Sequence, residues 1–174
     1  VLQPTPPVDS DAVERAATLL AAAKAPMIFV GSGALEASAE VGQLAEVLGA
    51  PVVSFRGGRG VVADDHPLGF TVAAGARLWP RTDVAVVIGS RFELLDIRWR
   101  HRPEGLKLIR IDIDPAEVRR IAAEVNLLAD AAEGASALAE AVLRVGPPPR
   151  RDEVVAEAKA AEEQAIQCVQ PQLD

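Results

Sequence analysis

The chain has 174 residues, 49% of them hydrophobic but only 3% aromatic, so its length suits one domain with a largely aliphatic core. Its formal net charge of −7 disfavours nucleic acid as a partner, because that binding is driven by basic surfaces. No apolar run approaches the roughly 18 residues of a membrane span, and the single cysteine, Cys168, excludes a disulfide framework within one chain. We therefore expect a cytoplasmic protein with no membrane partner.

Along the chain, apolar residues at helical spacing predict helices, and short continuous apolar runs predict strands. The predicted elements, in order, are a helix at 9–24, a strand at 26–30, a helix at 35–48, strands at 52–55, 83–89, 106–112 and 125–128, and helices at 71–79 and 131–143. A glycine-rich loop with irregular sequence lies between 56 and 69. Residues 151–168 favour a helix by composition, but their apolar stripe is thin, which leaves a linker as an alternative.

Three acidic residues are predicted to cap helices. Asp11, with Glu14 three residues later, fits a capping box at the start of the first helix. Asp114 precedes Pro115 and is the expected N-cap of a short helix. Asp130 repeats the capping pattern with Glu133. A capping role explains Asp114 and Asp130 without any ligand.

Strands that alternate with helices predict an α/β fold, a doubly wound Rossmann-like three-layer sandwich with a mostly parallel sheet. Such folds bind ligands beyond the carboxyl ends of their strands. The candidate positions at those ends are 31–33, 54–60, 89–91, 112–114 and Asp130.

The turn Gly31-Ser-Gly33 follows a predicted strand, where backbone N–H groups can hold a phosphate. Glu36 replaces the third glycine of the dehydrogenase fingerprint, and no acid follows the second strand to bind a ribose. A hydride-transferring dehydrogenase is therefore disfavoured. A tight turn without a ligand explains the two glycines equally well.

Charged residues offer two weaker hypotheses. Asp112, at a strand end, can accept hydrogen bonds from ribose hydroxyls or an adenine amine, although a structural role is equally compatible. A basic group in an otherwise acidic chain fits phosphates or an acidic partner, but a solvated or interdomain loop explains it more simply. Its members are Arg91, Arg98, Arg100, His101 and Arg102. His66 and His101 have too few companions to predict a metal site or a catalytic triad.

Five sequence blocks, in this order, resemble the central domain of thiamine diphosphate-dependent enzymes such as acetolactate synthase and benzoylformate decarboxylase. The blocks are Ala25–Gly33, Leu48–Val52, His66–Gly69, Asp83–Arg91 and Ile111–Glu117. The resemblance covers almost the whole chain and implies the NAD/FAD-binding type of domain that is also found in deoxyhypusine synthase.

The resemblance also implies a domain organisation. Residues 1–8 are expected to be a linker from an N-terminal pyrimidine-binding domain, 9–146 the central domain, and 147–174 a linker or helix toward a C-terminal diphosphate-binding domain. Those flanking catalytic domains of the same polypeptide would bind thiamine diphosphate and Mg²⁺, which this chain alone would not. The longer polypeptide would be a homo-oligomeric transferase or lyase, a carboligase or decarboxylase of 2-oxo acids.

In some members of the resembled family the central domain binds FAD or ADP. The matching positions here are Gly31, Gly33, Ser54, Phe55, Gly69, Gly89, Ser90, Arg91, Asp112, Ile113 and Asp130. The stretch from Arg91 to Leu95 departs from the acetolactate synthase pattern, because it lacks the Asp-Asp-Arg that usually follows Arg-Phe. The alternative function is a stand-alone module that binds FAD, ADP or NAD. We identify no catalytic residue and no metal ligand.

Overall fold

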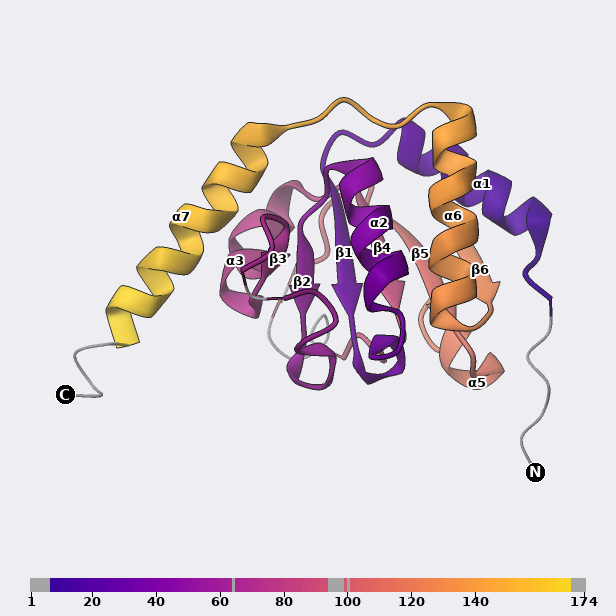
Figure 1. Cartoon of the computed structure of the whole chain (residues 1–174), viewed down its shortest axis with the longest axis horizontal. Helices are drawn as coiled ribbons and strands as arrows, with labels where there is room; N and C mark the ends of the chain where they lie inside the picture. Colours follow the sequence, from indigo (N-terminus) through magenta and orange to yellow (C-terminus); the bar gives the residue numbers. More distant parts are fainter. Residues whose placement is uncertain (1–6, 64, 94–98, 100, 170–174) are drawn as a thin grey trace.

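The computed structural model describes residues 7–63, 65–93, 99 and 101–169. Its centre is a six-stranded sheet with the order β3-β2-β1-β4-β5-β6, in which every pairing is parallel (Figure 1). The strands are β1 (Pro26–Val30), β2 (Val52–Ser54), β3 (Gly69–Phe70), β4 (Val84–Ile88), β5 (Lys107–Asp112) and β6 (Val125–Leu128). This is the strand order of the dinucleotide-binding doubly wound fold, so the predicted fold class is confirmed.

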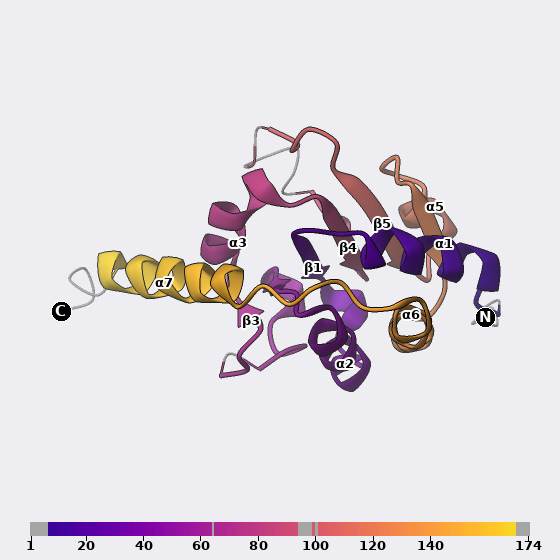
Figure 2. The same ribbon diagram turned by 90° about the horizontal axis from the view of Figure 1, so that it is seen from above.

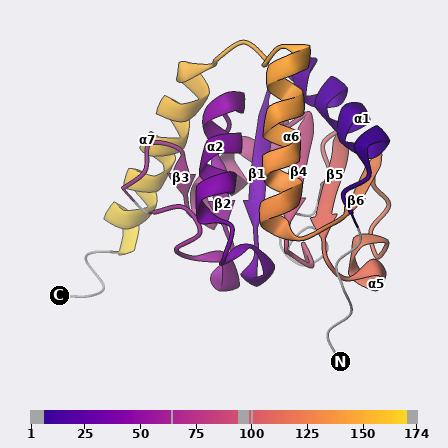
Figure 3. The same ribbon diagram turned by 45° about the vertical axis from the view of Figure 1, so that its right-hand side comes forward.

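Helices cover both faces of the sheet. One face carries α1 (Ser10–Ala21), α2 (Ser38–Leu48) and α6 (Ala131–Val145), and Figures 1 and 3 show α2 and α6 side by side in front of the strands. The other face carries α3 (Val72–Leu78) and α7 (Asp152–Val169). The described residues also form short elements: α5 (Pro115–Val118) and the 3₁₀ helices η1 (Ser32–Ala34), η2 (Arg56–Gly58) and η3 (Trp79–Arg81). None of the helices in the described part is long and apolar enough to cross a membrane.

The two faces have different cores. Side chains alternate along β1, so Ile28 and Val30 join the aliphatic core beneath α1, α2 and α6, whereas Met27 and Phe29 point to the other side. The chain has four Phe and two Trp, and all of them pack on that second face. Phe29 lies at the centre of the aromatic group, with ring centroids of Phe55, Phe92, Trp79 and Trp99 within 4.8–5.7 Å.

The structure corrects several predicted boundaries. Asp9, not Asp11, caps α1, because its Oδ1 accepts the N–H groups of Asp11 and Ala12 at 3.0 and 3.2 Å. The predicted capping box is therefore wrong. Helix α2 begins at Ser38 rather than at residue 35, because η1 ends at Ala34 and a turn over residues 35 and 36 follows it. The two-residue strand β3 is too short for a periodic pattern and was missed. The predicted caps Asp114 and Asp130 are confirmed.

Helix α7 packs against α3. Ala158 is fully buried, and both carboxylate oxygens of Glu162 accept the N–H of Thr71, at 3.1 and 3.2 Å. Glu157 forms ion pairs with Arg77 and Arg81 of α3 and η3. Figures 1 and 2 show α7 on the side of the molecule away from α1, running past α3. The predicted helix over 151–168 is therefore present and is held by the domain.

Candidate functional site

All carboxyl ends of the parallel strands lie at one edge of the sheet, which we call the carboxyl edge. From β1 the chain moves outward to β2 and β3, and then returns to β4 on the other side of β1. The strand order thus reverses between β1 and β4, the place where doubly wound folds bind ligands. Gly31 follows β1 and Gly89 follows β4, so two predicted site residues meet at this switch point.

The chain itself closes the switch point. Gly31 donates its N–H to the Ile88 carbonyl at 3.1 Å, and Gly33 donates to the Gly89 carbonyl at 3.0 Å. A Cβ on Gly31 would lie 2.4 Å from the Gly89 carbonyl oxygen, and a Cβ on Gly89 would lie 2.4 Å from the Gly33 carbonyl carbon. Only glycine permits this approach. The geometry therefore favours the tight-turn interpretation, since both N–H groups already have acceptors.

The predicted site residues on and after β2 and on β3 do not all lie at the carboxyl edge. Ser54 ends β2 at the carboxyl edge, but the Phe55 ring stacks on Phe29 with a centroid distance of 5.7 Å and belongs to the aromatic core. Gly69 begins β3 opposite Val52, so it lies two residues short of the edge. The carbonyl oxygen of Ala63 would be 2.5 Å from a Cβ on Gly69, which gives this glycine a packing role.

The acidic residues at the ends of β5 and β6 are bonded to nearby backbone. Asp112 Oδ1 accepts the N–H of Asp114 at 3.0 Å, and Asp130 Oδ1 accepts the N–H of Ala132 at 2.9 Å. Ile113, which directly follows Asp112, is 55% exposed and presents an apolar surface at the edge. The carboxylates keep their second oxygens for a ligand, but their positions are explained by local turns.

The three described members of the predicted basic group, Arg91, His101 and Arg102, do not lie together in one patch. Arg91 lies at the carboxyl edge, where its Nε is 3.4 Å from Glu117 Oε1. His101 and Arg102 belong to the segment that leads into the amino-terminal end of β5, and Arg102 donates to the Leu106 carbonyl. Arg98 and Arg100 lie outside the described residues. The two described ends of the group are therefore at opposite edges of the sheet.

Sequence reasoning missed Arg110, in the middle of β5. The residue is 1% exposed, and its Nη2 donates to the Ser90 carbonyl at 2.8 Å. Burial lowers the pKa of the Arg110 guanidinium below its ordinary value, and the negative charges of Asp112 and Glu117 partly oppose that shift. The sequence did contain a signal for this burial. Arg110 is a charged residue within a predicted interior strand, and because it is two residues from Leu108 it points to the same face of the sheet.

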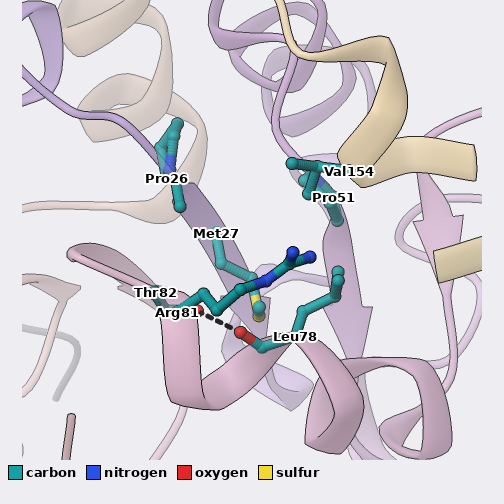
Figure 4. Close-up of a pocket in the computed structure, with 8 residues that line it drawn as sticks. Pro26, Met27, Pro51, Leu78, Arg81, Thr82 and Val154 are labelled. Atoms are coloured by element: carbon teal, nitrogen blue, oxygen red, sulfur yellow. Dashed lines mark hydrogen bonds between the residues drawn. The ribbon is translucent and has the colours of Figure 1, made fainter. Parts of the chain in front are cut away.

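Two small hollows lie at the opposite, amino-terminal edge. Figure 4 shows one of them, where Pro26, Met27, Leu78 and Arg81 face Val154 of α7. Each hollow has about 10 Å³ of free volume, the lower limit for one water molecule. Within the described ranges, no group of three or more His, Cys, Asp or Glu side chains could hold a metal ion.

The strand order defines a doubly wound, Rossmann-like α/β domain, and two glycine turns pack together at its switch point. The family described as thiamine pyrophosphate enzyme, central domain, matches residues 13–138, which is most of this sheet and its helices. The chain belongs to that family.

Individual relatives agree with this assignment. An acetolactate synthase of Mycobacterium avium is 36% identical over 165 residues, covering 86% of this chain and 26% of that protein. A proposed 2-ketoarginine decarboxylase of Pseudomonas aeruginosa is 38% identical over 111 residues, covering 61% of this chain and 20% of that protein. The crystal structure of a proposed thiamin diphosphate-dependent enzyme of Mycobacterium smegmatis has a TM-score of 0.68 at 26% identity, covering 87% of this chain and 30% of that one. The chain thus spans about a fifth to a quarter of the length of these two curated relatives.

Proposed function

We propose that this chain is the central, non-catalytic domain of a thiamine diphosphate-dependent carboligase or decarboxylase that acts on 2-oxo acids. The observation that carries the proposal is the family match over residues 13–138, which coincides with the doubly wound core. The names of two relatives, an acetolactate synthase and a 2-ketoarginine decarboxylase, support this reaction class.

The described residues do not fit the cofactor of such enzymes. Diphosphate is usually held through Mg²⁺ and oxygen ligands, but the described part of the chain contains no acidic or histidine cluster able to hold a metal ion. At the carboxyl edge, Asp114 and Asp130 cap helices, and Glu117 pairs with Arg91 and Arg120. We therefore derive no catalytic step from this chain and assign the chemistry to flanking domains.

A scaffold role agrees with the arrangement of the described ends. Helix α1 lies beside α6 and β6, whereas α7 lies beyond α3, near β3 at the other end of the sheet (Figure 1). This placement supports flanking domains that attach on opposite sides of the central one, with 1–8 and 147–174 as connecting segments. The contact between Glu162 and Thr71 would hold the second connection in a fixed direction.

The proposal is tested with the full polypeptide that carries this chain. Supplied with thiamine diphosphate and Mg²⁺, the full polypeptide should release CO₂ from at least one member of a panel of 2-oxo acids, including pyruvate and 2-ketoarginine. The 174-residue chain, assayed in parallel as the matched control, should release none. CO₂ release by the short chain alone, or none by the full polypeptide with any 2-oxo acid, would contradict the proposal. Sedimentation of the full polypeptide would test the predicted homo-oligomer.

A nucleotide at the carboxyl edge stays a prediction for Gly31, Gly33, Ser54, Phe55, Gly69, Gly89, Ser90, Arg91, Asp112, Ile113 and Asp130. Exposed Ile113, with Asp112 and Asp114 on either side of it in sequence, suits an adenine ring, whereas the closed glycine turn does not suit a diphosphate. Because a ligand that binds only the native state raises its stability, titration with FAD, ADP and NAD, followed by the melting temperature, decides the question.

A further inference from the structure

The loop that follows β4 holds a large side chain in an unfavourable backbone conformation. Phe92 has a left-handed backbone with φ of 54°, and apart from glycines it is the only described residue with a positive φ. A bulky residue rarely adopts this conformation, because its Cβ comes too close to the following carbonyl oxygen. Phe92 is nevertheless 1% exposed, and its ring centroid lies 4.8 Å from that of Phe29. The surrounding structure therefore compensates for backbone strain at this residue.

Three side chains hold the backbone immediately before and at Phe92. Arg110 Nη2 donates to the carbonyl of Ser90 at 2.8 Å, and Arg120 Nη2 donates to the carbonyl of Arg91 at 3.0 Å. Ser90 Oγ accepts the N–H of Phe92 at 3.2 Å. Arg110 belongs to β5 and Arg120 follows α5, so two consecutive carbonyl groups of the loop are held from outside it.

The two arginines differ in their surroundings. Arg110 is 1% exposed, and its Nε and Nη1 have no hydrogen-bond partner within the described residues. Arg120 is 40% exposed and pairs with Glu93 and Glu117 at 3.6 and 3.1 Å. Glu117 Oε2 is also buried and makes no hydrogen bond in the same part of the chain. Buried polar atoms without hydrogen bonds raise the free energy of the packed loop, and opening the loop to water would remove that cost.

We propose that the loop 89–92 is a two-state element, in which Phe92 either packs in the aromatic core or turns out to solvent. Arg110 and Arg120 act as positioning residues that favour the packed state. In that state, burial of the ring offsets the strained backbone and the unpaired polar atoms. In the open state, φ of Phe92 becomes negative and water reaches the Arg110 guanidinium. Because these contributions oppose each other, loss of a single contact shifts the populations of the two states.

Opening of this loop would change the other face of the sheet. The ring of Phe92 lies 6.0 Å from that of Trp79, centroid to centroid. Trp79 begins η3, and Arg81 at the end of η3 forms an ion pair with Glu157 of α7. A change at the carboxyl edge would thus alter the packing beneath α3 and α7. This inference goes beyond the scaffold function and does not depend on the reaction of the full polypeptide.

The test is fluorine NMR of the 174-residue chain labelled with para-fluorophenylalanine. The chain has four phenylalanines, and the signal of Phe92 is identified by its loss in Phe92→Leu. The open fraction is measured by how far this signal moves toward its position in the urea-unfolded chain. In Arg120→Met and Arg110→Met, the ratio of open to packed loop should rise by about fivefold or more, as expected for loss of one hydrogen bond.

Arg119→Met is the matched control. Arg119 is the exposed neighbour of Arg120, and none of the described hydrogen bonds to the loop comes from it, so the ratio should stay unchanged. Phe70 in β3 is an internal reference in the same spectra, because it packs on the same face of the sheet but at its edge.

A change in the Phe92 signal alone, in the variants of Arg110 and Arg120, supports the two-state loop. An unchanged Phe92 signal in both variants overturns it. Equal changes at Phe70 indicate general loosening of the core and also overturn the proposal, as does an equal change in Arg119→Met. Should Arg110→Met fail to fold, Arg120→Met decides by the same criteria, because its side chain is partly exposed.

Discussion

Gly33 donates its N–H to the carbonyl of Gly89 at 3.0 Å, so the turn after β1 closes directly over the end of β4. The two glycines are 56 residues apart in sequence, yet each would collide with the other if it carried a Cβ. The two turns thus pack against each other at the point where doubly wound folds bind their ligands. This contact also makes the switch point a stability determinant that can be measured.

Gly89→Ala should destabilise the chain by about 3 kcal/mol or more, because it combines overpacking with a left-handed backbone. The new Cβ would lie 2.4 Å from Gly33, and φ at Gly89 is 55°. Gly105→Ala is the matched control, since φ there is 72° but nothing lies within 4 Å of the added Cβ. The control should lose only about 1–2 kcal/mol in urea unfolding. Equal losses in the two variants would contradict the packing role of Gly89.

Substitution by alanine of the glycines within α2 and α6 should change the stability of the chain in opposite directions. Gly42 has nothing within 4 Å of an added Cβ, so Gly42→Ala should stabilise the chain by about 0.5–1 kcal/mol through helix propensity. At Gly134 the added Cβ would lie 2.6 Å from Ile111 Cγ2, so Gly134→Ala should destabilise despite the same gain in propensity. Denaturant midpoints check both signs, and two stabilising substitutions would show that α6 does not pack on β5 as closely as described.

Asp9→Ala and Asp11→Ala distinguish the real N-cap of α1 from the predicted one. Asp9→Ala should cost about 1 kcal/mol, because two backbone N–H groups lose their acceptor. Asp11→Ala should cost less than Asp9→Ala, toward the lower end of about 0.3–1 kcal/mol, since it removes only a favourable charge in the first turn. Thermal unfolding at low salt compares them. A larger loss of stability in Asp11→Ala than in Asp9→Ala would support the predicted capping box instead.

Glu162→Ala should release α7 from α3. It removes the acceptor of the Thr71 N–H, a charged hydrogen bond worth about 1.5–3 kcal/mol when buried and less here, where it is partly exposed. Hydrogen exchange along 152–169 should become faster while the sheet stays protected. Glu163→Ala, an exposed neighbour on the same helix, should leave exchange unchanged. Unchanged exchange in Glu162→Ala would mean that burial of Ala158 alone holds the helix.

Much of the fold was predictable from local pattern. The run 84–88 is continuously apolar because β4 is buried on both faces, and the caps Asp114 and Asp130 follow from the residues beside them. Element boundaries that depend on a few backbone hydrogen bonds were harder to predict from the sequence. The start of α2 and the two-residue strand β3 are examples, since neither leaves a periodic signal.

By itself, the sequence determined the alternation of strands and helices and the family resemblance, because both are written in residues close together along the chain. Tertiary structure decided what the candidate residues do. Gly31 and Gly89 became packing partners only because β1 and β4 are neighbours in the sheet. Arg110 became buried only because β5 lies between β4 and β6 with both faces covered. Glu162 reaches Thr71 across 91 residues. Contacts of this range depend on strand order and burial, which periodicity along a single chain does not encode.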